Sequence, residues 1–82
     1  FREQKERKQQ LQKLKSQLSA CEKDINDAET AISDMDEEMS RPEVAVNSAR
    51  LNEISSEQMK VKERLDKLYA DWERISEEIE SF

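Results

Sequence analysis

Apolar residues recur at alternating spacings of three and four along two long stretches of this 82-residue chain. On the N-terminal side of the midpoint the stripe comprises Leu11, Leu14, Leu18, Cys21, Ile25, Ala28, Ile32, Met35 and Met39. On the C-terminal side it comprises Leu51, Ile54, Gln58, Val61, Leu65, Leu68, Trp72, Ile75 and Ile79. This is the a/d heptad pattern of coiled coils, held for about four heptads on each side. It predicts two long amphipathic helices, at about residues 2–39 and about residues 48–81.

The one proline of the chain, Pro42, lies between these stretches, and the sequence has no glycine. Proline lacks the amide hydrogen that a helix interior needs, and it biases the preceding residue away from helical angles. We therefore predict a turn at about residues 40–48, with Asn47 or Ser48 capping the second helix through a side-chain oxygen. Because the two stripes have nearly equal length, the expected fold is all-α, a single antiparallel two-helix coiled-coil hairpin over residues 1–82.

Charge is unevenly distributed along the chain, whose net charge is −6. Residues 1–23 carry seven basic and three acidic side chains, whereas residues 24–43 carry one basic and eight acidic ones. A fold about residue 44 would set a basic group beside an acidic one, namely Lys5, Arg7, Lys8, Lys13 and Lys15 beside Asp71, Glu73, Glu77, Glu78 and Glu80. It would also set acids of the first helix beside bases of the second, namely Glu22, Asp24 and Asp27 beside Lys60, Lys62, Arg64 and Lys67. Exposed pairs are individually weak but together favour one alignment, and Gln58 in the apolar stripe is expected to fix that alignment.

Composition excludes most catalytic chemistry from this chain. It has no histidine and one cysteine, so zinc sites and Ser–His or Cys–His catalysis are unavailable, and without glycine it cannot form a phosphate-cradling loop. Cys21 lies in the apolar stripe, where a small packing residue is expected rather than a reactive thiol. We expect no catalytic residue, no metal and no cofactor site here, and hence no enzyme. No stretch is long and apolar enough for a membrane span, and the lone cysteine fits a reducing cytoplasm.

The basic opening offers two interpretations. The first is a phosphate-binding strip for RNA or DNA, in which each lysine or arginine side chain displaces a counterion. The candidate residues are Lys5, Arg7, Lys8, Lys13 and Lys15, with Arg41 at the turn as a weaker one. The alternative, which the acidic net charge favours, is that the acidic end of the second helix neutralises this strip.

The tract Leu68–Glu73 contains the only tyrosine and the only tryptophan of the chain. Trp72 falls on the apolar stripe, so we expect it to pack in the core near the open end of the hairpin. Tyr69 lies just beside the stripe and is expected to lean on the same packing. The residues assigned a structural role are Leu14, Leu18, Pro42, Leu65, Leu68, Tyr69 and Trp72.

Three tracts resemble the C-terminal coiled-coil domain of ABC-F proteins, the duplicated ATP-binding proteins of the Uup type. The opening Phe1–Glu6, "FREQKE", is similar to the Tyr-Lys-Glu-Gln-Arg-Glu tract that leaves the family's second ATPase domain. The turn tract Arg41–Val44, "RPEV", resembles the family's Asp-Pro-Glu element, and Leu68–Glu73 fits its Leu-Tyr-x-x-Trp-Glu pattern. The resemblance implies a C-terminal piece of a larger ATPase, with ATP and Mg²⁺ bound in the parent protein. It also implies an arm that contacts the ATPase domains of its own chain and the ribosome or other nucleic acid.

Two other classes of function stay open at this point. A structural coiled-coil spacer or a self-associating dimerisation module needs nothing beyond the apolar stripes. A tRNA-binding hairpin arm of an aminoacyl-tRNA synthetase has a similar length and charge. Because the net charge of −6 opposes phosphate, any binding of nucleic acid by the isolated chain is expected to be weak.

Overall fold

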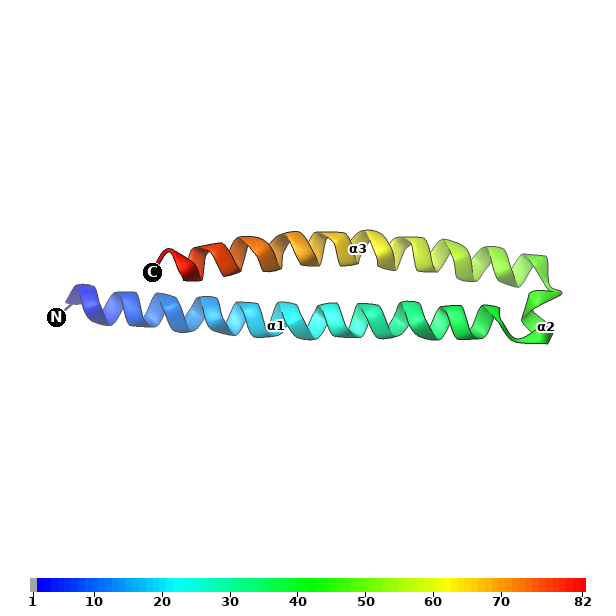
Figure 1. Cartoon of the computed structure of the whole chain (residues 1–82), viewed down its shortest axis with the longest axis horizontal. Coiled ribbons are helices and arrows are strands. Elements are labelled where there is room, and N and C mark those ends of the chain that lie inside the picture. Colours follow the sequence, from blue (N-terminus) through cyan, green and yellow to red (C-terminus); the bar gives the residue numbers. More distant parts are fainter. Residues whose placement is uncertain (1) are drawn as a thin grey trace.

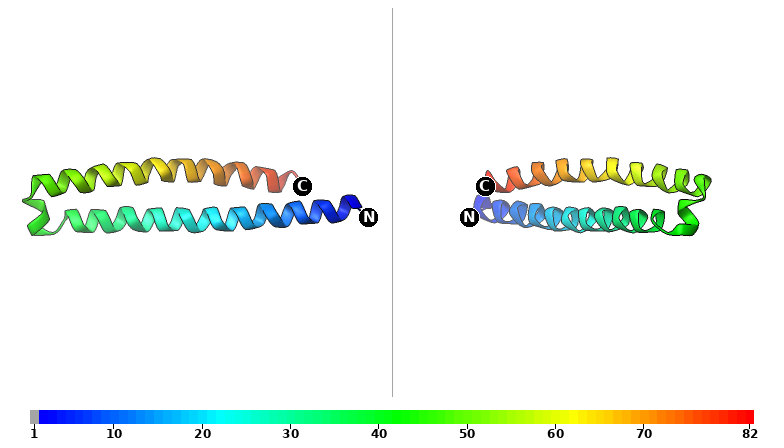
Figure 2. Two further views of the ribbon diagram at one scale, coloured as in Figure 1. Left: turned by 180° about the vertical axis from the view of Figure 1, so that it is seen from behind. Right: turned by 45° about the vertical axis from the view of Figure 1, so that its right-hand side comes forward.

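A computed structural model describes residues 2–82 and consists of two long antiparallel helices joined at one end (Figure 1). Helix α1 spans Arg2–Met39, the single-turn helix α2 spans Pro42–Ala45, and helix α3 spans Ser48–Glu80. The molecule measures 66 × 14 × 14 Å, and α1 and α3 lie side by side in all three views (Figures 1 and 2). The predicted all-α helical hairpin is therefore confirmed. Phe1, the first residue of the "FREQKE" tract, lies outside the described residues.

The connection contains one element that the sequence did not predict. Arg41 has extended backbone angles, as expected for a residue before proline, and Pro42 then begins the short helix α2. Proline suits the first turn of a helix because its missing amide hydrogen would have no partner there. After α2, the side-chain oxygen of Asn47 accepts a hydrogen bond from the Arg50 amide at 3.1 Å. Asn47 is thus the N-cap of α3, and one of the two predicted caps is confirmed.

Burial follows the predicted stripes but is complete only along part of them. The buried apolar side chains are Cys21, Ile25, Ala28, Ile54 and Ile75. Four leucines of the stripes, Leu14, Leu18, Leu65 and Leu68, are half-buried. This is what two packed helices can achieve, because each covers only one side of the other and the flanks of the seam stay in contact with water.

Gln58 fixes the alignment of the helices as predicted. Its side chain is 7% exposed, although it is polar and stands in the apolar stripe. The amide nitrogen donates one hydrogen bond to the backbone carbonyl of Ile32 at 3.1 Å and another to the Asp36 carboxylate at 2.6 Å. A buried amide needs such partners, and only one alignment of α1 and α3 supplies both of them.

Trp72 is less buried than predicted. Its side chain is 36% exposed, and the indole nitrogen donates a hydrogen bond to Glu22 of α1 at 3.2 Å. The expectation that Trp72 packs in the core is therefore wrong. A single facing helix is too narrow to cover a ring of this size, so the indole lies along the flank of the seam with its polar edge toward the carboxylate. Tyr69 is 46% exposed, and its hydroxyl donates to Glu29 of α1.

The alignment of the helices agrees with the predicted fold about residue 44, since the contacts Cys21–Leu68, Glu38–Arg50 and Ile32–Gln58 are centred on residues 44 to 45. The Cys21 thiol donates to the Leu68 carbonyl at 3.2 Å, and Phe82 at the end of the chain lies near Leu14. Helix α1 has 38 residues and α3 has 33, and the first turns of α1 extend past the end of α3 (Figure 1). We call residues 2–9 of α1 the overhang. It has no neighbour from the described part of α3.

Candidate nucleic-acid interface

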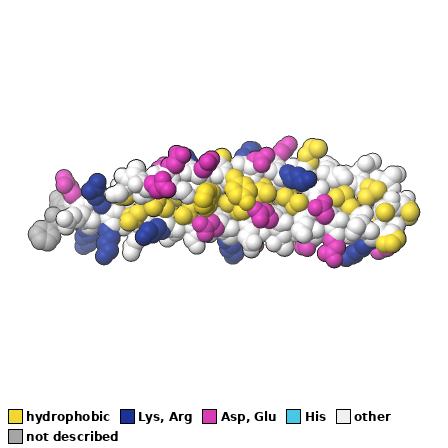
Figure 3. Space-filling view, in the orientation of Figure 1, with side chains coloured by type: hydrophobic (Ala, Val, Ile, Leu, Met, Phe, Trp, Pro, Cys, Tyr) yellow, Lys and Arg dark blue, Asp and Glu magenta, His cyan; other side chains and the backbone are white. Residues whose placement is uncertain are grey.

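The predicted basic residues lie at the open end of the hairpin, and three of them lie in the overhang. Lys5, Arg7 and Lys8 stand on the part of α1 that extends past α3, and all three are exposed. Lys13 and Lys15 follow where α3 begins to accompany α1, and both are also exposed. In the space-filling view, Lys and Arg side chains gather at this end, while acidic side chains are spread over the rest of the molecule (Figure 3).

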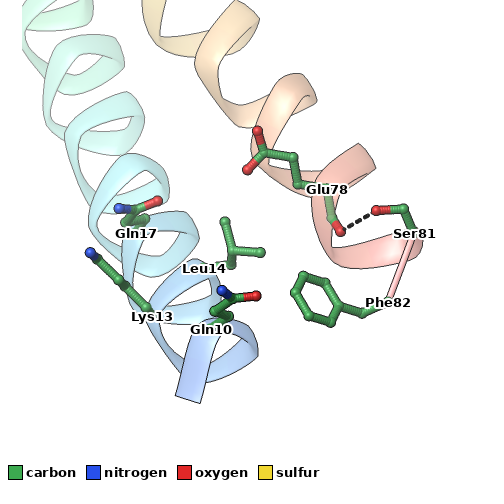
Figure 4. Close-up of a pocket in the computed structure, with 7 residues that line it drawn as sticks. All are labelled: Gln10, Lys13, Leu14, Gln17, Glu78, Ser81 and Phe82. Atoms are coloured by element: carbon green, nitrogen blue, oxygen red, sulfur yellow. Dashed lines mark hydrogen bonds between the residues drawn. The ribbon is translucent and has the colours of Figure 1, made fainter. Parts of the chain in front are cut away.

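The open end is closed by the last residue of the chain. Phe82 points from the end of α3 toward Leu14 of α1, and the Ser81 hydroxyl donates to the Glu78 carbonyl at 2.8 Å (Figure 4). These residues border an open groove of about 390 Å³ that is also lined by Gln10, Lys13 and Gln17. The apolar stripe of α1 ends at Leu11, and residues 3–10 carry only polar and charged side chains.

The predicted neutralisation of the basic opening is wrong for the overhang. Lys5, Arg7 and Lys8 do not lie beside the acids of α3, because those acids stop short of the overhang. Lys13 does share a groove with Glu78. Among the described residues, however, ion pairs form only around Arg50 and Arg74, so none of the five basic residues is paired with a carboxylate. The overhang is a mainly basic segment that is free of its predicted acidic neighbours.

In the second predicted set of opposite charges, some side chains lie near one another, but none of them forms an ion pair among the described residues. Asp24 and Asp27 line one groove with Arg64, as expected. Within the described residues the one ion pair that joins the two long helices is Arg50–Glu38, at 2.7 Å near the turn. This contact raises the pKa of the Arg50 guanidinium, mainly through the hydrogen bond to Glu38. The sequence did not point to this pair, because neither residue stands in an apolar stripe and neither belongs to the two sets of opposite charges that a fold about residue 44 was expected to bring together.

Arg41 does not join the other candidate residues. It lies at the turn, at the opposite end of the 66 Å hairpin from the overhang. Five acidic residues surround it in the sequence, Asp34, Asp36, Glu37, Glu38 and Glu43. A phosphate would meet net repulsion there, so we leave Arg41 out of the candidate interface.

Across the described residues, no three His, Cys, Asp or Glu side chains lie close enough together to hold a metal ion. In the same part of the chain, none of the helices has the length and apolar character needed to cross a bilayer. The Cys21 thiol is buried in the seam, and its pKa is raised, first by that burial and then by nearby Asp71. A thiol of this kind is a packing group, which agrees with the sequence-based expectation.

A protein-family model described as "ABC transporter C-terminal domain" matches residues 1–77. The chain belongs to this family. The match includes all three tracts that carried the resemblance, at Phe1–Glu6, Arg41–Val44 and Leu68–Glu73. No curated protein and no solved structure is similar enough to give a match.

Membership of the ABC transporter C-terminal domain family defines the general role of the chain. A C-terminal domain of this family is an accessory part of an ABC protein and not its catalytic part. The chain is accordingly a non-enzymatic helical arm attached to ATPase domains. This assignment favours the ABC protein over the tRNA synthetase arm among the classes that the sequence left open.

Proposed function

We propose that this hairpin is the accessory arm of an ABC-F-type ATPase of the Uup type, and that its basic first turns contact the phosphates of nucleic acid. In this proposal the ATPase domains of the parent protein bind ATP and Mg²⁺, and the arm works in the cytoplasm on DNA or on ribosomal RNA. The observation that supports it is the overhang. Lys5, Arg7 and Lys8 lie beyond the acids of α3, so their charges are available to an outside ligand.

The net charge of the chain limits the strength of this contact. Acidic side chains are scattered along the molecule (Figure 3), and the net charge is −6. Proteins with a fully basic face bind nucleic acid non-specifically with a Kd of roughly 10⁻⁴–10⁻⁶ M at physiological salt. A short basic segment on an acidic body should reach only the weak end of that range. In the parent ATPase, attachment to domains that bind the same target would raise the effective concentration of the arm.

The test is a titration of fluorescently labelled RNA and DNA duplexes with the chain at several salt concentrations, read by fluorescence anisotropy. Each phosphate contact contributes about 0.9 to the slope of log K against log salt on B-form DNA. The variant Lys5→Gln/Arg7→Gln/Lys13→Gln should therefore lose up to about three contacts and most of that slope. The matched control, Lys60→Gln/Lys62→Gln/Arg64→Gln, removes the same charge from exposed positions of α3 and should keep the binding and its salt slope.

Equal loss of binding in both variants would show that net charge alone governs the contact, and the proposed interface would be wrong. Sub-micromolar, salt-insensitive binding that survives the three changes at the open end would also contradict it. Complete absence of binding by the unmodified chain at low salt would contradict the proposed contact with nucleic acid. The chain would then be an arm that makes only protein contacts.

A further inference from the structure

One flank of the hairpin carries both large aromatic side chains of α3. Tyr69 and Trp72 are 46% and 36% exposed, and they reach across the seam to Glu29 and Glu22 of α1, respectively. We call this flank the aromatic face. Because Glu22 is about midway between the start of α1 and the turn, the two rings lie near the middle of the long axis.

The charges of α1 on the aromatic face follow an ordered series. Residues seven apart lie on nearly the same side of a helix, since two turns take about 7.2 residues. Counting in sevens from Glu22 and Glu29 along α1 gives five charged residues that we call the charge stripe, namely Lys8, Lys15, Glu22, Glu29 and Asp36. The sign of the charge changes once along it, between Lys15 and Glu22. All five side chains are exposed. The open half of the stripe is thus basic, and the half toward the turn is acidic.

We propose that a second copy of this chain docks antiparallel on the aromatic face, with the two-fold axis passing near Glu22 and Trp72. In that arrangement Lys8 of one copy lies opposite Asp36 of the other, and Lys15 opposite Glu29. The axis repeats both pairs, so four complementary charge pairs form in one dimer. A two-fold interface must be self-complementary in this way, because the same patch serves both copies.

The aromatic side chains and the size of the face support the same arrangement. Tyr69 and Trp72 lie near the proposed axis, so the four rings of two copies would meet at the centre, where interfaces concentrate aromatic residues. A side of the molecule that is 66 Å long and 14 Å wide has an area on the order of 900 Å². Standard stable interfaces bury about 800 Å² per partner, so one face of this hairpin is large enough.

The charge series distinguishes this orientation from others. A parallel pair of hairpins would set Lys8 against Lys8 and Asp36 against Asp36, and every position of the stripe would repel its equivalent. Antiparallel docking leaves only Glu22 facing its own copy, and there the Trp72 indole of the same chain donates a hydrogen bond to that carboxylate. The product is a four-helix arrangement with the two turns at opposite ends.

The first experiment measures the mass of the 82-residue chain by sedimentation equilibrium. We expect a dimer that dissociates on dilution for the unmodified chain, and a monomer for Lys8→Glu/Lys15→Glu at the same concentration. The matched control is Arg64→Glu/Lys67→Glu, which changes the net charge equally. These residues lie about 140–160° around α3 from Tyr69, so the control should remain dimeric. Should the first variant lose helicity by circular dichroism, Lys8→Gln/Lys15→Gln gives the same comparison.

A second experiment tests the pairing and its direction. Lys15→Glu and Glu29→Lys should each dimerise more weakly alone and should form a mixed dimer when combined, and Asp36 is left unchanged because it accepts a hydrogen bond from the buried Gln58 amide. A spin label at Ser40→Cys, in a Cys21→Ala background, marks the turn of each copy. The antiparallel dimer holds the two labels on the order of 50 Å apart, from about 1.5 Å of rise per residue, whereas a parallel dimer brings them together.

Three results would overturn the proposal: a monomeric unmodified chain up to about 1 mM, equal dissociation of the control and the stripe variant, or two turn labels that lie close together. Lys8 and Lys15 are also candidate phosphate contacts, so the second copy and nucleic acid would compete for these two residues, but the two tests remain separate. The nucleic-acid test changes Lys5, Arg7 and Lys13, none of which belongs to the charge stripe, so failure of one proposal leaves the other standing.

Discussion

Replacing Ile54 with alanine is expected to be the most informative single change to the core. Ile54 is 1% exposed, the lowest value among the described side chains of the seam, and it lies in α3 one turn before the buried amide of Gln58. Alanine keeps the helix intact, because it has the highest helix propensity of all residues. The substitution therefore removes packing and leaves the local backbone preference unharmed.

The expected magnitude follows from the burial. Replacement of a buried isoleucine by alanine costs about 2–5 kcal/mol, of which one part is lost transfer free energy and the rest is the cavity that remains. In a hairpin only two helices thick, neighbouring side chains and water can fill that space, so the lower half of the range applies. A loss of about 2–3 kcal/mol would lower the Tm of a domain of this size by roughly 10–20 °C.

The assay is thermal and urea unfolding followed by circular dichroism at 222 nm, at one fixed protein concentration because self-association would also raise the Tm. The matched control is Met59→Ala on the same helix, at a side chain that is 65% exposed. It should change the free energy of unfolding by less than about 0.5 kcal/mol, as exposed substitutions usually do. If the two variants unfold alike, Ile54 does not stand in the centre of the seam and the alignment of α1 with α3 is wrong.

Three further predictions concern the flank of the seam. Trp72→Ala should lower the free energy of unfolding by about 2 kcal/mol, which is less than the ~3–5 kcal/mol of a fully buried tryptophan. The fluorescence of Trp72 should report a partly hydrated ring, and a loss of stability as large as about 5 kcal/mol would contradict its exposure. The hydrogen bond to Glu29 raises the pKa of Tyr69, so the stability from this bond is present below the ordinary value near 10 and is lost as pH rises through the raised pKa. Absorbance titration at 295 nm should show that upward shift and its reduction in Glu29→Gln, and an unchanged titration would refute the contact. Burial raises the pKa of the Cys21 thiol, so thiol reagents at pH 8 should react slowly until urea unfolds the chain, and rapid labelling of the folded chain would be inconsistent with a buried thiol.

The shape of the molecule could be predicted from the sequence because one signal dominates it. Two a/d stripes flank a single proline, and this pattern permits few folds other than a helical hairpin. The role of Gln58 was also predictable, since a polar residue in an apolar stripe must find partners when it is buried. The cap at Asn47 follows from local side-chain chemistry, which does not depend on the rest of the fold.

The free basic overhang and the packing of the flanks could not be predicted in the same way. A centre near residue 44 was predicted correctly, but it sets Lys5 and Arg7 opposite positions 83 and 81, which are past Glu80, the last acid of α3. Lys5, Arg7 and Lys8 therefore lie at or beyond the end of the acids that were expected to neutralise them. Trp72 fits the spacing of the stripe, but spacing contains no information on how much of a large ring one facing helix can cover.

The most direct test of a phosphate-binding open end is a nuclear magnetic resonance titration of the ¹⁵N-labelled chain with an RNA duplex at low salt. The amide shifts should change along residues 3–15, in graded amounts that reverse when salt is added, while the turn around Arg41 stays unchanged. Shifts that cluster at the turn or are spread evenly over both helices would contradict an interface at the overhang.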